Sequence, residues 1–246
     1  MAHLLRIELL GEFRVYSAER VITRFSTQKA ASLLAYLAYH PGPHSREMLV
    51  EIFWPGRLPE AGRGSLSQAL STLRRQLEPP SVPAGGVIVA SKTSVGLNPE
   101  AIQTDFGEFQ KALGKARLAA GHSERRQALE DALGLYGGEL LPGSYEDWVQ
   151  AEQRLLADAY FHAVESLATL LEDDGDISQA IEHARRAVIL DPFREESHQQ
   201  VMRLWAAAGR PAAALEQYRA LERLLRQELG AEPASATRKR RPETDR

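Results

Sequence analysis

Side chains that could bind a ligand lie together on one face of a helix predicted at residues 64–78. Four leucines (Leu66, Leu70, Leu73 and Leu77) share one side of a helical wheel. The opposite side carries Ser67, Gln68, Ser71, Thr72 and Arg75, with Arg74 on its flank. Glutamine can bond adenine in two places, arginine can bond guanine or phosphate, and short hydroxyls can bond phosphate. A solvated polar face is the alternative, but such a face usually carries Glu, and none occurs here before Glu78. The pattern therefore favours a helix that lies in the major groove of DNA.

Lys92 is a second candidate contact, at the tip of a predicted hairpin. Residues 87–90 and 95–97 flank the turn Ser91-Lys92-Thr93-Ser94, as two short strands would. If the helix at 64–78 lies in a major groove, Lys92 is expected over a phosphate or the minor groove. Without that context it is an ordinary surface lysine.

The elements that must position these side chains form a small domain of strands, three helices and a hairpin. Alternating apolar residues predict strands at 4–10 and 13–16, and helical spacing predicts helices at 27–39, 45–54 and 64–78. Ser26 or Thr27 can cap the first helix, and Pro41-Gly42-Pro43 ends it. This order predicts a winged helix-turn-helix domain with small antiparallel β elements at residues 1–98.

Beyond Asp105 the pattern is wholly helical and repeats itself. Helices are expected near residues 105–120, 123–136, 145–173, 176–190, 194–208 and 211–229. An offset of 34 residues, the tetratricopeptide period, places Gly175 on Gly209 and Ala180 on Ala214. The chain is therefore predicted to be mostly α, with an all-α, tetratricopeptide-like domain at residues 99–236 and a polar tail at 237–246.

Composition restricts the classes of function that remain. Zero cysteines exclude disulfides, a thiolate zinc site and a cysteine nucleophile. The sequence holds no nucleotide-binding or hydrolase motif, and the proline-rich turn between His40 and His44 argues against a shared metal, so we expect no enzyme, cofactor or metal. No secretory or membrane-spanning segment is recognisable, which predicts a soluble, cytoplasmic protein that contacts no membrane.

Charge separates the two halves of the chain. Residues 1–98 hold 11 Lys and Arg against 7 Asp and Glu, whereas residues 99–236 hold 14 against 24. A mildly basic front and a strongly acidic back indicate two surfaces with different partners.

The sequence resembles the Streptomyces antibiotic regulatory protein family, which joins an OmpR-like winged helix to a bacterial transcriptional activator domain. The resemblance is carried by residues 31–37 (ASLLAYL), 53–55 (FWP), 70–78 (LSTLRRQLE), 105–106 (DF), 132–141 (ALGLYGGELL), 191–196 (DPFREE), 209–210 (GR), 214–218 (ALEQY) and 228–233 (ELGAEP). It implies binding to promoter direct repeats in double-stranded DNA, possible homodimers on DNA, and recruitment of RNA polymerase. It also implies that Leu73-Arg74 lies among the DNA-contacting residues. The wing departs from the family pattern Gly-Tyr-x-Leu, because this sequence has Ser94-Val95-Gly96-Leu97.

Three hypotheses about function follow. The first is a sequence-specific DNA-binding transcriptional activator. The second is a helical-repeat adaptor whose winged helix binds protein, and the third is the N-terminal, DNA-binding portion of a larger ATP-dependent regulator.

Overall fold

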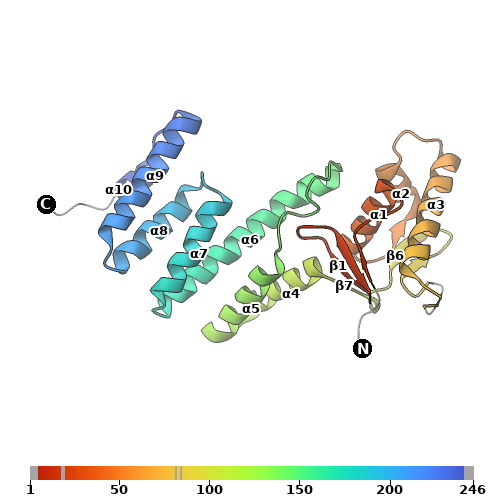
Figure 1. Ribbon diagram of the computed structural model, residues 1–246, viewed down its shortest axis with the longest axis horizontal. Helices are drawn as coiled ribbons and strands as arrows, with labels where there is room; N and C mark the ends of the chain where they lie inside the picture. Colours follow the sequence, from red (N-terminus) through yellow and green to blue (C-terminus); the bar gives the residue numbers. More distant parts are fainter. Residues whose placement is uncertain (1–4, 18–19, 81, 84, 241–246) are drawn as a thin grey trace. The chain divides into compact units, whose positions relative to one another are not determined.

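The computed structural model describes residues 5–17, 20–80, 82–83 and 85–240, and it contains two compact units (Figure 1). The N-terminal unit comprises Met1–Gln110 and Leu135–Gln150. The helical unit comprises Lys111–Gly134 and Ala151–Arg246. Among the described residues, no helix is long and apolar enough to cross a membrane.

A four-stranded sheet begins the N-terminal unit. Its strands are β1 (Leu5–Glu8), β2 (Arg14–Ser17), β3 (Val21–Ile22) and β7 (Ile102–Thr104), in the order β3-β2-β1-β7. The β1–β2 pair is antiparallel, as the sequence predicts. The β2–β3 pair is also antiparallel, and β3 was not among the predicted strands. The β1–β7 pair is parallel and brings residues 102–104 into the sheet of the winged helix. Three residues are too few to show a strand period, so this pairing could not be predicted from the pattern of residues.

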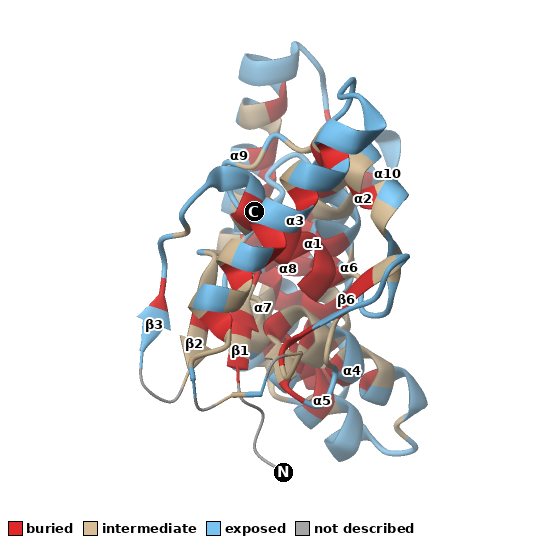
Figure 2. Cartoon of the chain, turned by 90° about the vertical axis from the view of Figure 1, so that its right-hand side faces the viewer, coloured by how far each residue is buried: buried red, intermediate tan, exposed pale blue. Residues whose placement is uncertain are grey.

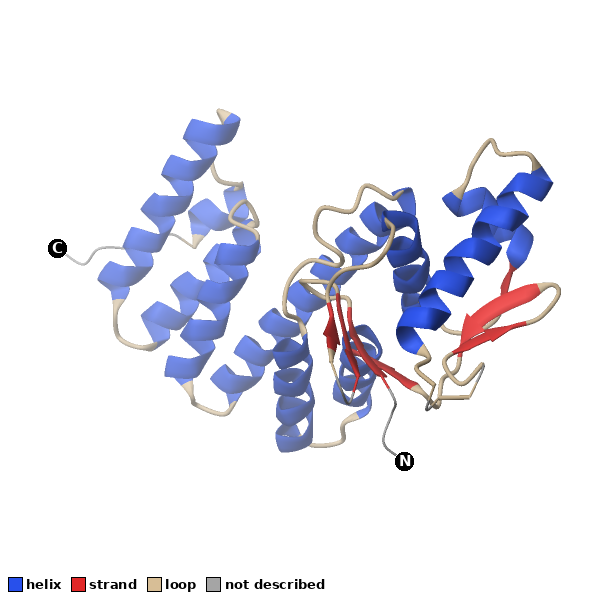
Figure 3. Cartoon of the chain, turned by 45° about the vertical axis from the view of Figure 1, so that its right-hand side comes forward, coloured by secondary structure: helices blue, strands red, loops and turns tan. Residues whose placement is uncertain are grey.

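Three helices and a second sheet complete the winged helix (Figure 3). They are α1 (Gln28–Tyr39), α2 (Arg46–Phe53) and α3 (Pro59–Leu77), with the hairpin β5 (Ile88–Ala90) and β6 (Ser94–Leu97) joined to β4 (His44–Ser45) in the order β4-β6-β5. The predicted cap of α1 is present, because the Thr27 side chain accepts a hydrogen bond from the N–H of Ala30 at 3.1 Å.

Helix α3 starts five residues before the predicted position. Pro59 lies in its first turn, where a proline needs no N–H partner, so the helix can begin there. Gly62 lies where α3 passes α2, and a Cβ at this position would lie 2.3 Å from Cγ1 of Val50. A glycine that looks like a helix breaker in the sequence therefore allows the two helices to approach closely.

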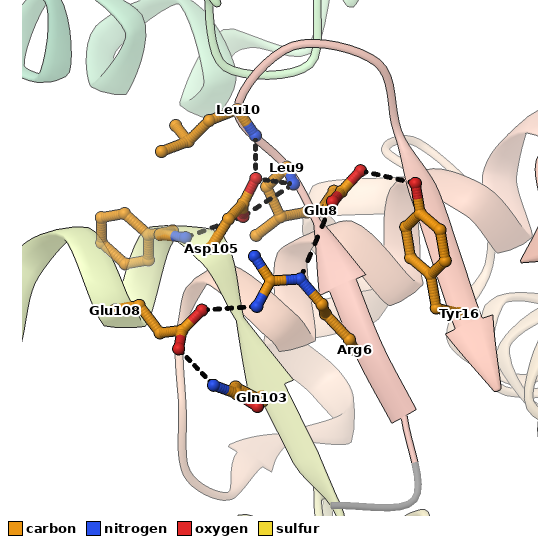
Figure 4. Close-up of polar contacts among 9 residues, drawn as sticks. Arg6, Glu8, Leu9, Leu10, Tyr16, Gln103, Asp105 and Glu108 are labelled. Carbon is orange, nitrogen blue, oxygen red and sulfur yellow. Dashed lines mark hydrogen bonds and ion pairs between the residues drawn. The ribbon is translucent and has the colours of Figure 1, made fainter. Parts of the chain in front are cut away.

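Asp105 ties the first sheet to helix α4 (Asp105–Leu118), as Figure 4 shows. Its buried carboxylate accepts hydrogen bonds from the N–H groups of Leu9 and Leu10, each at 2.9 Å, and of Phe106 at 2.7 Å. Burial raises the pKa of Asp105, and the backbone donors oppose that rise. Nearby, Nη1 of Arg6 donates to Glu108 at 2.6 Å. These contacts join residues about a hundred positions apart and orient α4 against β1.

The helical unit contains paired helices. The elements in this part of the chain are α5 (His122–Leu135), α6 (Asp147–Asp173), α7 (Ile177–Leu190), α8 (Glu195–Ala207), α9 (Pro211–Leu229) and α10 (Ser235–Lys239). The first residues of α6 and the last of α5 belong to the N-terminal unit.

The predicted 34-residue repeat is present in the turns of this unit. Gly175 and Gly209 both have positive φ, +82° and +70°. The turn after α6 has a hydrogen bond from the N–H of Asp176 to the carbonyl of Leu171 at 2.8 Å, and Arg210 N–H to Trp205 repeats it at 2.9 Å after α8. Ala180 and Ala214 are both fully buried. The same turn geometry at the same spacing makes this part tetratricopeptide-like.

Helix α10 overlaps the start of residues 237–246, the segment predicted to be a polar tail. Thr237 is buried, and its hydroxyl contacts Glu195 and accepts from Gln199 at 2.8 Å. The N–H of Ala234 also donates to Glu195, at 2.9 Å. The residues at 241–246 of that segment lie outside the described residues, as does Leu4 of the first predicted strand.

Candidate DNA-binding site

Helix α3 presents the predicted polar face to solvent. Ser67, Gln68, Ser71 and Arg75 are exposed and Thr72 is half-buried. The four leucines of the opposite face are buried, so α3 shows a buried side and an exposed side in Figure 2. The amphipathic pattern of the sequence therefore orients these five side chains.

Arg74 lies apart from that face, over the base of the hairpin. Its Nη2 donates to the carbonyl of Ile88 at 3.3 Å, and its Nε is 3.8 Å from Glu78. Glu78 in turn accepts from the N–H groups of Val87 at 3.0 Å and Ile88 at 2.8 Å. Arg74 and Glu78 thus attach the start of β5 to the end of α3. In this geometry Arg74 has a structural partner, and its contact with DNA stays a prediction.

A groove of about 850 Å³ separates the N-terminal half of α3 from the hairpin turn. It is lined by Ser45, Arg46, Glu47, Arg63, Ser67, Ala90, Ser91, Lys92 and Thr93. Three of these side chains are cations and one is a carboxylate. Glu47 lies 3.3 Å from Arg63, which leaves the groove with a net positive charge. Such a surface suits the phosphate backbone of a nucleic acid.

The hairpin turn holds Lys92 at its tip in an ordered conformation. The Ser91 hydroxyl accepts from the N–H of Thr93 at 3.1 Å and of Ser94 at 2.9 Å. Lys92 is exposed and lines the groove together with Ser67 of α3. The structure therefore brings one residue of each predicted contact region, Ser67 and Lys92, to the same groove. The other predicted contact residues of α3 do not line it: Gln68, Ser71, Thr72, Arg74 and Arg75.

Arg46 and Arg63 also line this groove, and the sequence analysis missed both. Arg46 begins α2, and its Nη2 donates to the Ser67 hydroxyl at 3.2 Å. Arg63 lies one turn before Ser67 in α3. Arg63 was missed because the predicted helix began only at residue 64. A helix predicted from Pro59 would have included it.

Gly96 lies at the unrestricted position of the family's wing pattern, whereas the departures from that pattern are Ser94 and the buried Val95. A Cβ at Gly96 would lie 2.5 Å from the carbonyl oxygen of Gly42, so β6 passes directly against the turn after α1. Any residue with a Cβ in place of Gly96 would push β6 away from the turn after α1.

The described residues contain no group of three or more His, Cys, Asp or Glu side chains arranged to hold a metal ion.

The fold and the groove define a winged-helix protein with a basic surface between its third helix and its wing, followed by tetratricopeptide-like helices. Comparison with protein families identifies the second part. Residues 104–243 match the family described as "Bacterial transcriptional activator domain", which is more than half of the chain. The chain therefore belongs to this family and, with it, to the Streptomyces antibiotic regulatory proteins that the sequence resembles.

Relatives of known role are regulators. The regulatory protein AfsR of Streptomyces coelicolor is 26% identical over 231 residues, which cover 93% of this chain and 23% of AfsR. The transcriptional regulator RedD of the same organism is 27% identical over 223 residues, 87% of this chain and 63% of RedD. The chain thus spans less than two thirds of either relative.

A solved structure shares the fold. EmbR of Mycobacterium tuberculosis, determined in complex with a low-affinity phosphopeptide, superposes with a TM-score of 0.78 at 21% identity. The match covers 98% of this chain and 64% of EmbR. The chain therefore shares the fold of EmbR, a winged helix followed by tetratricopeptide-like helices.

Proposed function

We propose that this protein is a transcription regulator that binds duplex DNA through its N-terminal unit. The observation that carries the proposal is the exposed face of α3 from Ser67 to Arg75, which presents hydroxyls, an amide and an arginine and contains no carboxylate. The one exposed carboxylate of this helix, Glu60, lies in its first turn, about two turns before Ser67. In this proposal α3 lies in the major groove and the hairpin turn lies over the neighbouring phosphates.

The side chains of this face have different roles in the proposal. Gln68 and Arg75 read base edges, because amide and guanidinium groups can make two hydrogen bonds to one base. Ser67, Ser71 and Thr72 bond phosphate oxygens, and Lys92 neutralises a phosphate beneath the hairpin. Arg74 is added to the proposed DNA contacts because the family resemblance implies that Leu73-Arg74 lies among the DNA-contacting residues.

We propose further that residues 1–98 and 99–236 act as DNA-binding and activator domains. The relatives are named as regulators, which supports a role in regulation rather than catalysis. In this proposal the protein acts in the cytoplasm. The excess of acidic residues in the second half supports contact with a protein, for which RNA polymerase is the proposed partner, rather than with DNA. Binding as a homodimer at promoter direct repeats is the arrangement that the family resemblance suggests.

The alternative is an adaptor in which the winged helix binds a protein. The tetratricopeptide-like turns favour protein contacts in general, but the basic groove between α3 and the hairpin favours DNA as the partner of the N-terminal unit. The chain aligns with 23% of AfsR, so it is also compatible with a place within a longer regulator.

Binding of the full chain to a duplex from its own promoter region tests the proposal. Gln68→Ala or Arg75→Ala should cost about 1 to 3 kcal/mol at the preferred site and relax the preference at one base position. Arg219→Ala with Arg223→Ala is the matched control, because both residues are exposed arginines of α9. This control should change binding by less than about 0.5 kcal/mol.

The result that contradicts the proposal is a wild-type chain whose affinity for duplex DNA does not depend on salt. Equal losses in the α3 variants and in the α9 control would instead move the DNA contact away from α3.

A further inference from the structure

Arg46 connects three elements that surround the basic groove. Its backbone N–H donates to the carbonyl of Thr93 at 3.0 Å, which joins the start of α2 to the hairpin turn. Its guanidinium donates to the carbonyl of Ser91 at 3.4 Å and to the hydroxyl of Ser67 at 3.2 Å. One side chain therefore links the hairpin turn to the exposed face of α3.

The hairpin is attached to α3 at two places. Its base is held by Glu78, which accepts from the N–H groups of Val87 and Ile88. Its turn is held by Arg46, about half the length of α3 away from Glu78. The contact at the base is half-buried, whereas both guanidinium contacts of Arg46 are exposed and long. Backbone pairing with β4 and with the N–H of Arg46 holds the hairpin to the start of α2, and the guanidinium of Arg46 adds a link from the turn to α3 that a change in one side chain can remove.

Arginine suits this role for a geometric reason. The guanidinium is a planar fork that donates to two acceptors at once, here Nη1 to Ser91 and Nη2 to Ser67. A lysine at this position would carry the same charge on a single nitrogen at the end of a flexible chain. It could not hold both acceptors in one fixed geometry.

We propose that Arg46 is a positioning residue that sets the width of the groove between α3 and the hairpin turn, so that Lys92 reaches a phosphate of the DNA strand lying in it. This inference rests on the proposed function and concerns the DNA backbone alone. Arg46 acts through Lys92, while the charge of the groove supplies the attraction for the strand.

The charge-conserving variant Arg46→Lys separates positioning from charge. Backbone contacts do not depend on sequence, so the probe is a short duplex of arbitrary sequence, titrated with the full chain at several salt concentrations. Lys92→Ala in the wild-type background should lower the slope of log affinity against log salt by about 1, since one phosphate contact is lost.

Arg46→Lys should lower the slope by a similar amount although the net charge is unchanged. Adding Lys92→Ala to Arg46→Lys should then change the slope no further, because the lysine has already lost its phosphate. Arg57→Lys is the matched control. Arg57 is an exposed arginine of the same unit that donates to the Ser65 hydroxyl at 2.9 Å, but it does not line the groove and makes no contact with the hairpin among the described hydrogen bonds. The slope of this variant should therefore equal that of the wild type.

Hydrogen exchange of the free protein gives a second measurement that does not involve DNA. Peptides covering residues 88–97 should exchange faster in Arg46→Lys than in the wild type and in Arg57→Lys. A purely electrostatic role for Arg46 predicts unchanged exchange, and it predicts that Lys92→Ala lowers the salt slope equally in both backgrounds. Either result overturns the inference.

The proposed function and this inference fail in different ways. A wild-type chain that binds no duplex overturns both. If the wild type binds duplex DNA with a salt-dependent affinity and Arg46→Lys has the same salt slope, only the role of Arg46 is overturned.

Discussion

The two units are stabilised by contacts of different range. In the N-terminal unit, Asp105 reaches back to Leu9 and Leu10, and Arg6 reaches forward to Glu108. In the helical unit, the corresponding features are local turns that recur every 34 residues, at Gly175 and Gly209. A unit built on long-range contacts should lose its structure as a whole, whereas a stack of similar repeats should lose it near the site of damage.

The two parts of the chain also differ in charge, but not in how far their cations are paired. Arg6 lies 2.6 Å from Glu108 and Lys29 lies 3.0 Å from Glu146, just as Arg126 of the helical unit lies 2.9 Å from Glu130. The difference is in the net charge, because Lys and Arg exceed Asp and Glu in residues 1–98 and are fewer than them in residues 99–236. The part proposed to bind DNA therefore has an excess of cations, and the helical part has an excess of carboxylates.

Removal of Asp105 should have the largest effect on this comparison. Asp105→Ala leaves the buried N–H groups of Leu9 and Leu10 and the half-buried N–H of Phe106 without an acceptor. Each buried group left unpaired costs about 1 to 3 kcal/mol, so the N-terminal unit should lose about 3 kcal/mol or more. Glu195→Ala is the matched change in the helical unit. It removes a half-exposed carboxylate that holds α10, and it should cost about 1 kcal/mol.

Urea unfolding followed by hydrogen exchange of peptides from each unit measures both effects. Exchange should rise throughout the N-terminal unit in Asp105→Ala and only near α8 and α10 in Glu195→Ala. Equal and unit-wide losses in the two variants would contradict the difference in range.

Glycine substitutions should change the stability by smaller amounts. Those at the left-handed turns should destabilise the protein, and one inside a helix should stabilise it. Gly175→Ala places a side chain at φ +82°, in the left-handed region, and should cost about 1 to 2 kcal/mol. Gly209→Ala should cost a similar amount, since the turn is repeated. Gly114→Ala is the control, because Gly114 lies inside α4 with no atom within 4 Å of the new Cβ.

That control should stabilise the protein by about 0.5 to 1 kcal/mol, as alanine is the better helix former. Thermal unfolding of the three variants measures the signs. A neutral Gly175→Ala beside a costly Gly209→Ala would mean that the two turns are not equivalent.

Acidification should affect the two units in opposite directions, by the smallest amount. Burial lowers the pKa values of His183 and His198 below the ordinary 6.5. The unfolded chain therefore takes up protons first, and the helical unit should lose stability as the pH falls below about 6.5. Burial raises the pKa of Asp105 above 3.8, so there the folded chain takes up the proton first. The N-terminal unit should gain stability from Asp105 as the pH falls toward that value.

Urea titrations between about pH 7 and pH 5, with exchange read separately for each unit, measure these slopes. His183→Gln combined with His198→Gln should remove much of the loss in the helical unit. A slope unchanged in this double variant would assign the pH dependence to other groups.

The sequence by itself determined the features that depend on one element or on a regular period. Helical spacing in the leucines of α3 decided which side of that helix is buried, and so which polar residues face solvent. Thr27 is recognisable as the N-cap of α1, and the offset of 34 residues identifies the equivalent glycine turns. Such signals are readable because helix periodicity and turn conformation are local properties of the chain.

Only the tertiary structure decided which distant residues meet. The parallel pairing of β7 with β1, the burial of Asp105 and the closeness of Arg46 to Ser67 join positions 21 to 97 residues apart, and no local pattern encodes them. Arg74 is the clearest case. Helical spacing predicts Arg74 on the flank of the polar face. The carbonyl of Ile88 at the hairpin base and the carboxylate of Glu78 lie nearby, so the guanidinium turns toward them. Sequence spacing sets the direction in which a side chain leaves its helix, and the neighbours that folding brings to it set where its charged end lies.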